Sequence, residues 1–251
     1  MRVACLLSGQ PRFCKSFDIQ LQHLKNDLEI DWFCSMWKNN EQPKDKVVIP
    51  PALLNTDANS AGEYISNRLP LGHRLIDIEA IDEPDTTHIV EKNYHRTGWP
   101  LPEHVYLMYL GVYRANQLKL KHEALTGQYD LVIRTRPDLS LNQDINLLEL
   151  KKFIDQHENL IVSPKNHRHG AGHTNDQFAI GTSKSINLYA EAANKLDEIY
   201  NSGVEYGPET LLYHHLKRSG IVDHIGGFEV NLREHYYVEN NRHIVDLGSW
   251  G

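Results

Sequence analysis

The chain has few cysteines, no long apolar run and no excess of positive charge. Its 251 residues include three cysteines and no Cys-x-x-Cys pair, a pattern typical of reduced thiols in a cytoplasmic protein. No segment approaches the roughly 18 apolar residues of a membrane span, and the first residues lack the pattern of a secretory signal peptide. The net charge of −7 argues against a nucleic-acid partner, which requires a basic surface. We therefore expect a soluble cytoplasmic protein with no transmembrane segment and no nucleic-acid partner.

Short apolar runs alternate with amphipathic patterns along the chain, which is typical of a parallel sheet with crossover helices. Strands are predicted at residues 3–7, 32–37, 74–78, 130–134, 160–162, 178–181 and 221–225. Helices are predicted at residues 13–28, 61–69, 103–125, 147–154, 183–197 and 208–218. The predicted fold class is α/β, with a mostly parallel central sheet flanked by helices in a single domain over residues 1–251.

The segment 129–141 joins a short apolar strand to a group of charged residues. Arg134, Arg136 and Asp138 follow the apolar residues 131–133 at alternate positions, so we expect them on one face of an extended backbone. Guanidinium groups suit phosphate oxygens, and a carboxylate suits Mg²⁺ or Mn²⁺. The pattern predicts a site for a nucleotide-type substrate. A local set of salt bridges at the strand end is an alternative of equal weight.

A polar turn follows the first predicted strand. In open α/β sheets ligands bind beyond the carboxyl ends of strands, and this turn offers backbone N–H groups, an amide and a guanidinium. It matches neither the phosphate-binding loop of nucleotide triphosphatases nor the G-x-G-x-x-G pattern. An ordinary strand–helix turn is the alternative. The candidate ligand-binding residues here are Ser8, Gly9, Gln10 and Arg12.

Two carboxylates in the second half of the chain are candidates for acid–base chemistry. Asp176 lies between Asn175 and Gln177, just before the strand predicted at 178–181, and a carboxylate there suits an acceptor hydroxyl or a general base. The alternative, which we favour for the triplet alone, is an Asx turn that starts the strand. Glu209 lies in the first turn of a predicted helix, where the helix dipole alone favours an acidic residue.

Histidines offer a weaker indication of a metal site. His167, His169 and His173 lie in one loop, but no cysteine or carboxylate completes a standard zinc spacing, so a flexible polar loop is the favoured interpretation. His235 stands alone among aromatic residues near the C-terminus, where a structural role is the more common one.

Together these segments resemble a group of GT-A-like glycosyltransferases found in surface-glycan clusters of bacteria and in some large viruses and phages. The resemblance extends over roughly residues 2–220 and is carried by residues 7–12, 109–116, 129–138 and 175–181 and by Pro208-Glu209. It implies a Rossmann-like nucleotide-sugar half, about residues 1–138, joined in one continuous sheet to an acceptor half, about residues 139–251.

The resemblance also implies residue roles. Enzymes of this group place an Asp-x-Asp motif at the end of a central strand, where it holds a divalent cation on the donor diphosphate. Here the matching position reads Arg136-Pro137-Asp138, so Asp138 remains as a metal ligand and His235 is a second candidate. Arg134 and Arg136 are expected to take over part of the charge neutralisation. The implied cofactor is Mn²⁺ or Mg²⁺.

The expected activity is transfer of a sugar from a nucleotide-sugar donor to a hydroxyl of a glycan or lipid-linked acceptor. Asp176 is the first candidate for the base and Glu209 the second. Three alternatives stay open: a sulfotransferase or other phosphoryl-type transferase, a catalytically inactive nucleotide- or glycan-binding module, and a structural protein with a buried salt-bridge cluster.

Overall fold

A computed structural model describes residues 1–11, 15–24, 28–38, 57–92, 94, 101–157, 159–165 and 172–232. The first part contains β1 (Val3–Gly9), α1 (Lys15–Leu24), β2 (Ile30–Trp37), α2 (Ala58–Ser66), β3 (His73–Ile81), α3 (Thr87–Val90), α4 (Pro102–Thr126) and β4 (Leu131–Thr135). The second contains β5 (Leu139–Leu141), α5 (Leu147–Asp155), β6 (Leu160–Ser163), β7 (Ala179–Gly181), α6 (Ser183–Ala190), η2 (Glu191–Asn194), α7 (Leu196–Asn201), α8 (Pro208–Arg218), β8 (Val222–Ile225) and β9 (Val230–Leu232).

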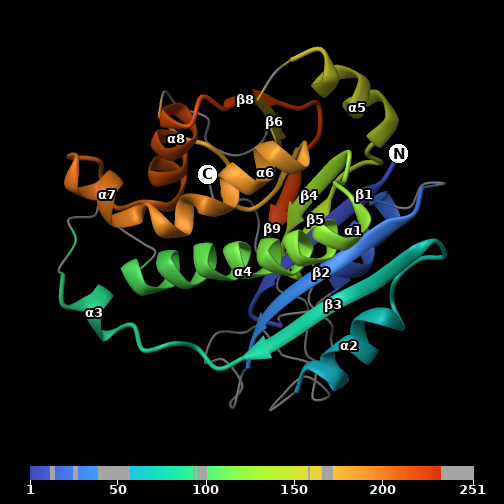
Figure 1. The fold of residues 1–251 in the computed structure, drawn as a ribbon, viewed down its shortest axis with the longest axis horizontal. Coiled ribbons are helices and arrows are strands. Elements are labelled where there is room, and N and C mark those ends of the chain that lie inside the picture. The colour runs from blue at the N-terminus through green and yellow to red at the C-terminus, as the bar shows by residue number, and fades with distance from the viewer. Residues whose placement is uncertain are drawn as a thin grey trace, which may run out of the picture.

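Seven strands form one sheet in the order β3-β2-β1-β4-β7-β6-β8 (Figure 1). The first four strands are mutually parallel, β7 is antiparallel to both of its neighbours, and β8 is again parallel to β6. The α/β class and the mostly parallel sheet are thus confirmed, and the β3-β2-β1-β4 order is that of a Rossmann-like half.

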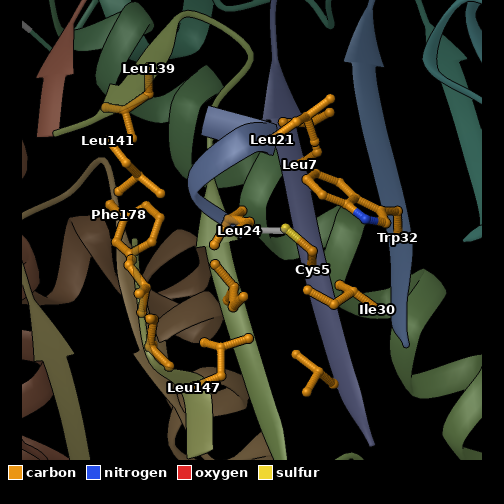
Figure 2. Packing of buried hydrophobic residues seen from close by; sticks show 14 of the residues in the cluster. Cys5, Leu7, Leu21, Leu24, Ile30, Trp32, Leu139, Leu141, Leu147 and Phe178 are labelled. Atoms are coloured by element: carbon orange, nitrogen blue, oxygen red, sulfur yellow. The ribbon is translucent and has the colours of Figure 1, made fainter. Parts of the chain in front are cut away.

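The sheet separates two apolar cores because successive side chains of a strand point to opposite faces. On one face Cys5, Leu7 and Trp32 pack with Leu21 and Leu24 of α1, as Figure 2 shows. The other face is covered by α4, α6 and α8 and contains a second cluster, including Leu6, Phe33, Val132, Tyr109, Ile186 and Leu212. Because β1, β2 and β4 are buried on both faces, apolar residues occupy consecutive positions in them and do not alternate with polar ones.

The direction of the strands gives the sheet two chemically distinct ends. We call the end where β1, β2, β3 and β4 finish the carboxyl end, and the end where they begin the amino end. The chain passes from β1 through α1 on one face to β2, and returns from β3 through α4 on the other face to β4. The direction of winding therefore reverses between β1 and β4, which makes a topological switch point there.

One local prediction needs correction, and three short elements were not predicted. The helix predicted at 183–197 is divided into α6, the 3₁₀ turn η2 and α7, and η2 packs against both α4 and α8. The small antiparallel sheet of β5 and β9 was not predicted, since strands of three residues show no periodicity and their partners lie far apart in the chain. The four-residue helix α3 was also missed.

None of the helices within the described ranges is long and apolar enough to cross a membrane.

Candidate functional site

The carboxyl ends of β1 and β4 meet at the switch point. Leu7 of β1 pairs in register with Thr135, the last residue of β4. The last residues of β1, Ser8 and Gly9, with Gln10 after them, and the segment 136–138 after β4 therefore lie at the same end of the sheet. In open α/β sheets ligands bind in the crevice at this position.

The reversal of β7 brings the Asp176 segment to the same place. Because β7 runs opposite to β4, the residues before β7 lie at the carboxyl end of the sheet. Asn175 Oδ1 accepts hydrogen bonds from the backbone N–H groups of Gln177 at 3.0 Å and Phe178 at 2.7 Å. The triplet thus forms the predicted Asx turn. The turn also holds Asp176 almost fully buried, with 4% of its surface exposed.

Arg134 lies behind this turn with none of its surface exposed. Its Nη1 donates to the backbone carbonyl of Gln177, whereas Nε and Nη2 have no hydrogen-bond partner among the described residues. Burial and the nearby charge of Arg136 lower the pKa of Arg134, and the negative charge of Asp176 acts in the opposite direction. A buried cation with unpaired donors is unfavourable unless polar groups or a ligand complete its surroundings.

Asp176 and its neighbours show the same incomplete pairing. Asp176 Oδ1, Asn175 Nδ2 and Gln177 Oε1 are buried and have no partner in the described part of the chain. Native proteins contain few such groups, so a local concentration of them is a signal for a functional site.

Arg136 and Asp138 form a bidentate ion pair. Arg136 Nε donates to Asp138 Oδ1 at 2.9 Å, and Nη2 donates to Oδ2 at the same distance. The side chain of Arg136 is 20% exposed and that of Asp138 is 2% exposed. Burial opposes the charge on Arg136, but the Asp138 carboxylate raises its pKa. The salt bridge that the sequence offered as an alternative is therefore present between Arg136 and Asp138. Arg134 is not part of this salt bridge.

Two buried tyrosines and Glu209 connect the helices α4, α6 and α8 to the Asp176 turn. The Tyr109 hydroxyl donates to the carbonyl of Pro208 at 2.8 Å, and the Tyr189 hydroxyl donates to the carbonyl of Asn175 at 3.3 Å. Burial raises the pKa of both phenols, so both remain protonated donors. The carbonyl of Glu209 accepts the backbone N–H of Thr174 at 3.1 Å, which joins the start of α8 to the Asp176 turn.

Sequence reasoning missed the parts played by Tyr109, Tyr189 and Gln20. Gln20 Nε2 donates to Thr135 Oγ1 at 2.7 Å and to the carbonyl of Leu139 at 3.1 Å, which fixes the exit of β4. A polar residue on the apolar face of α1, beside Phe17 and Leu21, was an available signal. Both tyrosines fitted the apolar faces of their helices and gave no such signal.

The turn predicted after residue 7 needs correction, because β1 continues through Ser8 to Gly9 and pairs there with β2. Gly9 has a φ of +129°, a backbone conformation that favours glycine. Ser8 is buried, and Gln10 Nε2 donates to Glu83 Oε1 at 3.3 Å while its Oε1 is buried without a partner in the described part of the chain. Arg12, the fourth residue predicted for this loop, lies outside the described residues.

Some of the predicted metal ligands lie among the described residues and others do not. Asp138 is held by Arg136, and His235 lies outside the described residues. Of the loop histidines, His173 shares a 3.3 Å hydrogen bond with Thr210 Oγ1, and His167 and His169 are not among the described residues. Within the described ranges no group of three or more His, Cys, Asp or Glu side chains is arranged to hold a metal ion.

Comparisons with known proteins assign no family to the chain. No protein-family model matches it, and no curated protein matches it either.

Proposed function

We propose that the chain is a glycosyltransferase of the GT-A type, which moves a sugar from a nucleotide-sugar donor to a hydroxyl of a glycan or lipid-linked acceptor. The observation that carries the proposal is the convergence of three segments at the switch point. The end of β1, the Arg136–Asp138 pair after β4 and the buried Asp176 turn before β7 meet at the same end of the sheet. The continuous sheet, parallel in the β3-β2-β1-β4 half and mixed beyond it, supports the same assignment.

Binding of the donor diphosphate is assigned to the carboxyl ends of β1 and β4. Arg136 is partly exposed and presents the planar fork that suits phosphate oxygens, and Asp138 holds that fork in one orientation. Backbone N–H groups of Ser8, Gly9 and Gln10, together with Arg12, are proposed to hold the remaining oxygens. Arg134 contributes a fixed positive charge from behind the site, because charge that develops on a leaving diphosphate is stabilised by preorganised cations.

Activation of the acceptor is assigned to the Asp176 turn and the start of α8. If the anomeric centre is inverted, a base must remove the proton of the acceptor hydroxyl in the transition state. Asp176 is the proposed base because its buried Oδ1 is unpartnered among the described residues. Arg134, through the carbonyl of Gln177, positions the turn that carries it. Glu209, half-buried at the start of α8, is the second candidate.

The described residues around Asp138 do not form a metal site. Both carboxylate oxygens of Asp138 bond Arg136, and no cluster of further ligands accompanies them in the described ranges. The chemistry above is therefore assigned to arginines and backbone donors. A divalent cation held by Asp138 and His235 stays a prediction.

A thermal-shift panel tests the function. UDP-, GDP- and CMP-sugars should raise the melting temperature, while PAPS and ATP should not, because the chain lacks their phosphate loops. Asp138→Ala should abolish glycosyl transfer and the donor-induced shift, since it releases the Arg136 fork. Stabilisation by PAPS or ATP alone, or unchanged transfer by the Asp138 variant, would reject the assignment.

A second candidate is an inactive nucleotide- or glycan-binding module. The Arg136–Asp138 ion pair favours it, because the carboxylate expected to bind the cation on the donor diphosphate is already paired with an arginine. Hydrolysis of the donor, measured with and without Mn²⁺, separates the two candidates. A module of this kind would bind the donor and release no free sugar.

A further inference from the structure

The Arg136–Asp138 pair stands where the resemblance to GT-A-like enzymes implies two carboxylates and a divalent cation. Both oxygens of Asp138 accept hydrogen bonds from Arg136, each at 2.9 Å, and only 2% of the Asp138 side chain is exposed. A cation would have to displace the guanidinium group from a buried carboxylate, and the positive charge of the guanidinium would repel it. The surroundings of Asp138 therefore do not fit a metal ligand.

The pair carries the same net charge as the implied metal site. Two carboxylates and a divalent cation are neutral overall, and so are Arg136 and Asp138 together, because arginine stays protonated in proteins. An arginine in place of the first carboxylate changes the local charge by the same amount as the binding of a divalent cation. The positive charge that the leaving diphosphate needs is therefore part of the chain itself.

Arg136 keeps hydrogen-bond donors that Asp138 does not use. A guanidinium group has five N–H donors, and the two bonds to Asp138 use Nε and one N–H of Nη2. Among the described residues, none accepts a hydrogen bond from Nη1 or from the second N–H of Nη2. The side chain is 20% exposed, so this second edge of the fork is suited to two oxygens of a phosphate.

Arg134 provides a second positive charge beside the pair. Burial and the charge of Arg136 lower the pKa of Arg134, so the two guanidinium groups lie close to each other. Because Arg134 has no exposed surface, it acts on a ligand through its charge and not by contact. A phosphate on the outer edge of Arg136 would thus meet one cation in contact and another behind it.

We propose that Arg136 takes the place of the divalent cation, so that the diphosphate of the nucleotide sugar binds without a metal ion. The identification of the ligand as a donor diphosphate rests on the proposed function. The conclusion that Asp138 is not a metal ligand rests on the ion pair alone, and it contradicts the cation that the resemblance implies.

Calorimetric titration with UDP and GDP, in EDTA and in Mn²⁺, tests the inference on the unmodified protein. At least one nucleotide should bind, and EDTA should weaken its binding by no more than about threefold. Arg136→Met should weaken binding in EDTA by about ten- to 100-fold, the effect of one hydrogen bond between charged groups. Arg136→Lys, which keeps the charge but not the fork, should bind more weakly than the unmodified protein and stay insensitive to EDTA.

Arg74→Met is the matched control for Arg136→Met. Arg74 pairs with the buried Asp31 at the other end of the sheet, through Nε at 2.9 Å and Nη2 at 2.7 Å. Its substitution removes an arginine from a buried aspartate in the same way, and it should leave the affinity for the nucleotide unchanged.

A titration of the unliganded protein with Mn²⁺, followed by the EPR signal of the free ion, tests Asp138 without a nucleotide. The unmodified protein should bind no more Mn²⁺ than Asp138→Ala does, because Arg136 holds both carboxylate oxygens. Nucleotide binding that is lost in EDTA, or Mn²⁺ binding that Asp138→Ala removes, would overturn the inference. A protein that binds neither nucleotide in either condition would reject the proposed function, and equal Mn²⁺ binding by Asp138→Ala would then still support the assignment of Asp138.

Discussion

The two ends of the sheet differ in how completely their buried charged groups are hydrogen-bonded. At the amino end, Lys119 has no exposed surface, and its ammonium group bonds Glu123 at 3.0 Å, Ser183 at 2.5 Å and Asn187 at 2.8 Å. At the carboxyl end, Arg134 is equally buried, but two of its three nitrogens have no partner among the described residues. Lys119 has three hydrogen-bond partners, whereas Arg134 has donors without a partner in the described part of the chain.

The same contrast holds for the carboxylates. Asp31, at the amino end, accepts from Arg74 Nε at 2.9 Å and from the Tyr129 hydroxyl at 2.7 Å. Asp176, at the carboxyl end, has one oxygen without a partner in the described ranges, and Arg134 is nearby. Saturated networks stabilise a fold, whereas unsaturated buried groups persist where function requires them. The amino end therefore contributes stability, whereas the carboxyl end contains the candidate site.

The largest expected effect is a loss of turnover, and it is tested by an Asp→Asn substitution at each end of the sheet. Asp176→Asn should reduce turnover by about 10²- to 10⁴-fold, the usual contribution of a general base, while stabilisation by the nucleotide sugar is retained. Asp31→Asn, at a carboxylate of similar burial, should lower the urea midpoint and leave the proposed turnover of the folded protein intact. Steady-state kinetics and urea titration of both variants provide the measurement. A loss of turnover of equal size in both variants would remove the contrast between the ends.

Removal of the two buried cations compares their structural weight. Lys119→Met leaves the buried Glu123 carboxylate without its ammonium partner and should lower the free energy of unfolding by about 3–5 kcal/mol. Arg134→Met should lower it clearly less, because the guanidinium has unpaired donors, but should impair transfer through the Gln177 turn. Urea unfolding at constant m-value measures both losses. A larger loss for Arg134→Met would make Arg134 the structural cation.

His73 is an exception at the amino end, and pH tests it. Burial lowers its pKa from 6.5 to about 4, and its Nε2 has no partner in the described part of the chain. Between pH 6.5 and about 4, His73 is protonated in the unfolded chain but neutral in the folded chain. Stability is therefore complete above pH 6.5 and falls as the pH drops towards 4, by up to about 3 kcal/mol.

Urea unfolding from pH 7.5 to 4 should show this slope and a reduced slope for His73→Gln, which keeps an acceptor for the Trp32 N–H group. Parallel profiles for the two proteins would show that His73 is protonated without penalty in the fold.

Much of the secondary structure could be predicted because the relevant patterns are local. The apolar runs of β1, β2 and β4 reflect burial on both faces of the sheet, and Pro102 and Gly127 mark the ends of α4. The Asx turn at Asn175 was also predictable, since its side chain bonds backbone groups two and three residues away. The division of 183–197 was not, because contacts with α4 and α8 override a continuous helical pattern.

For the candidate site, the sequence by itself determined which residue types lie near the strand ends: a glycine at the end of β1, arginines and a carboxylate at and after the end of β4, and an acid before β7. Tertiary structure alone decided that β7 runs backwards and so brings Asp176 to the ends of β1 and β4. It also decided that Arg136 pairs with Asp138 while Arg134 is buried. The physical reason is range: periodicity and capping act over a few residues, whereas strand direction and burial of a charge depend on segments far apart in the chain.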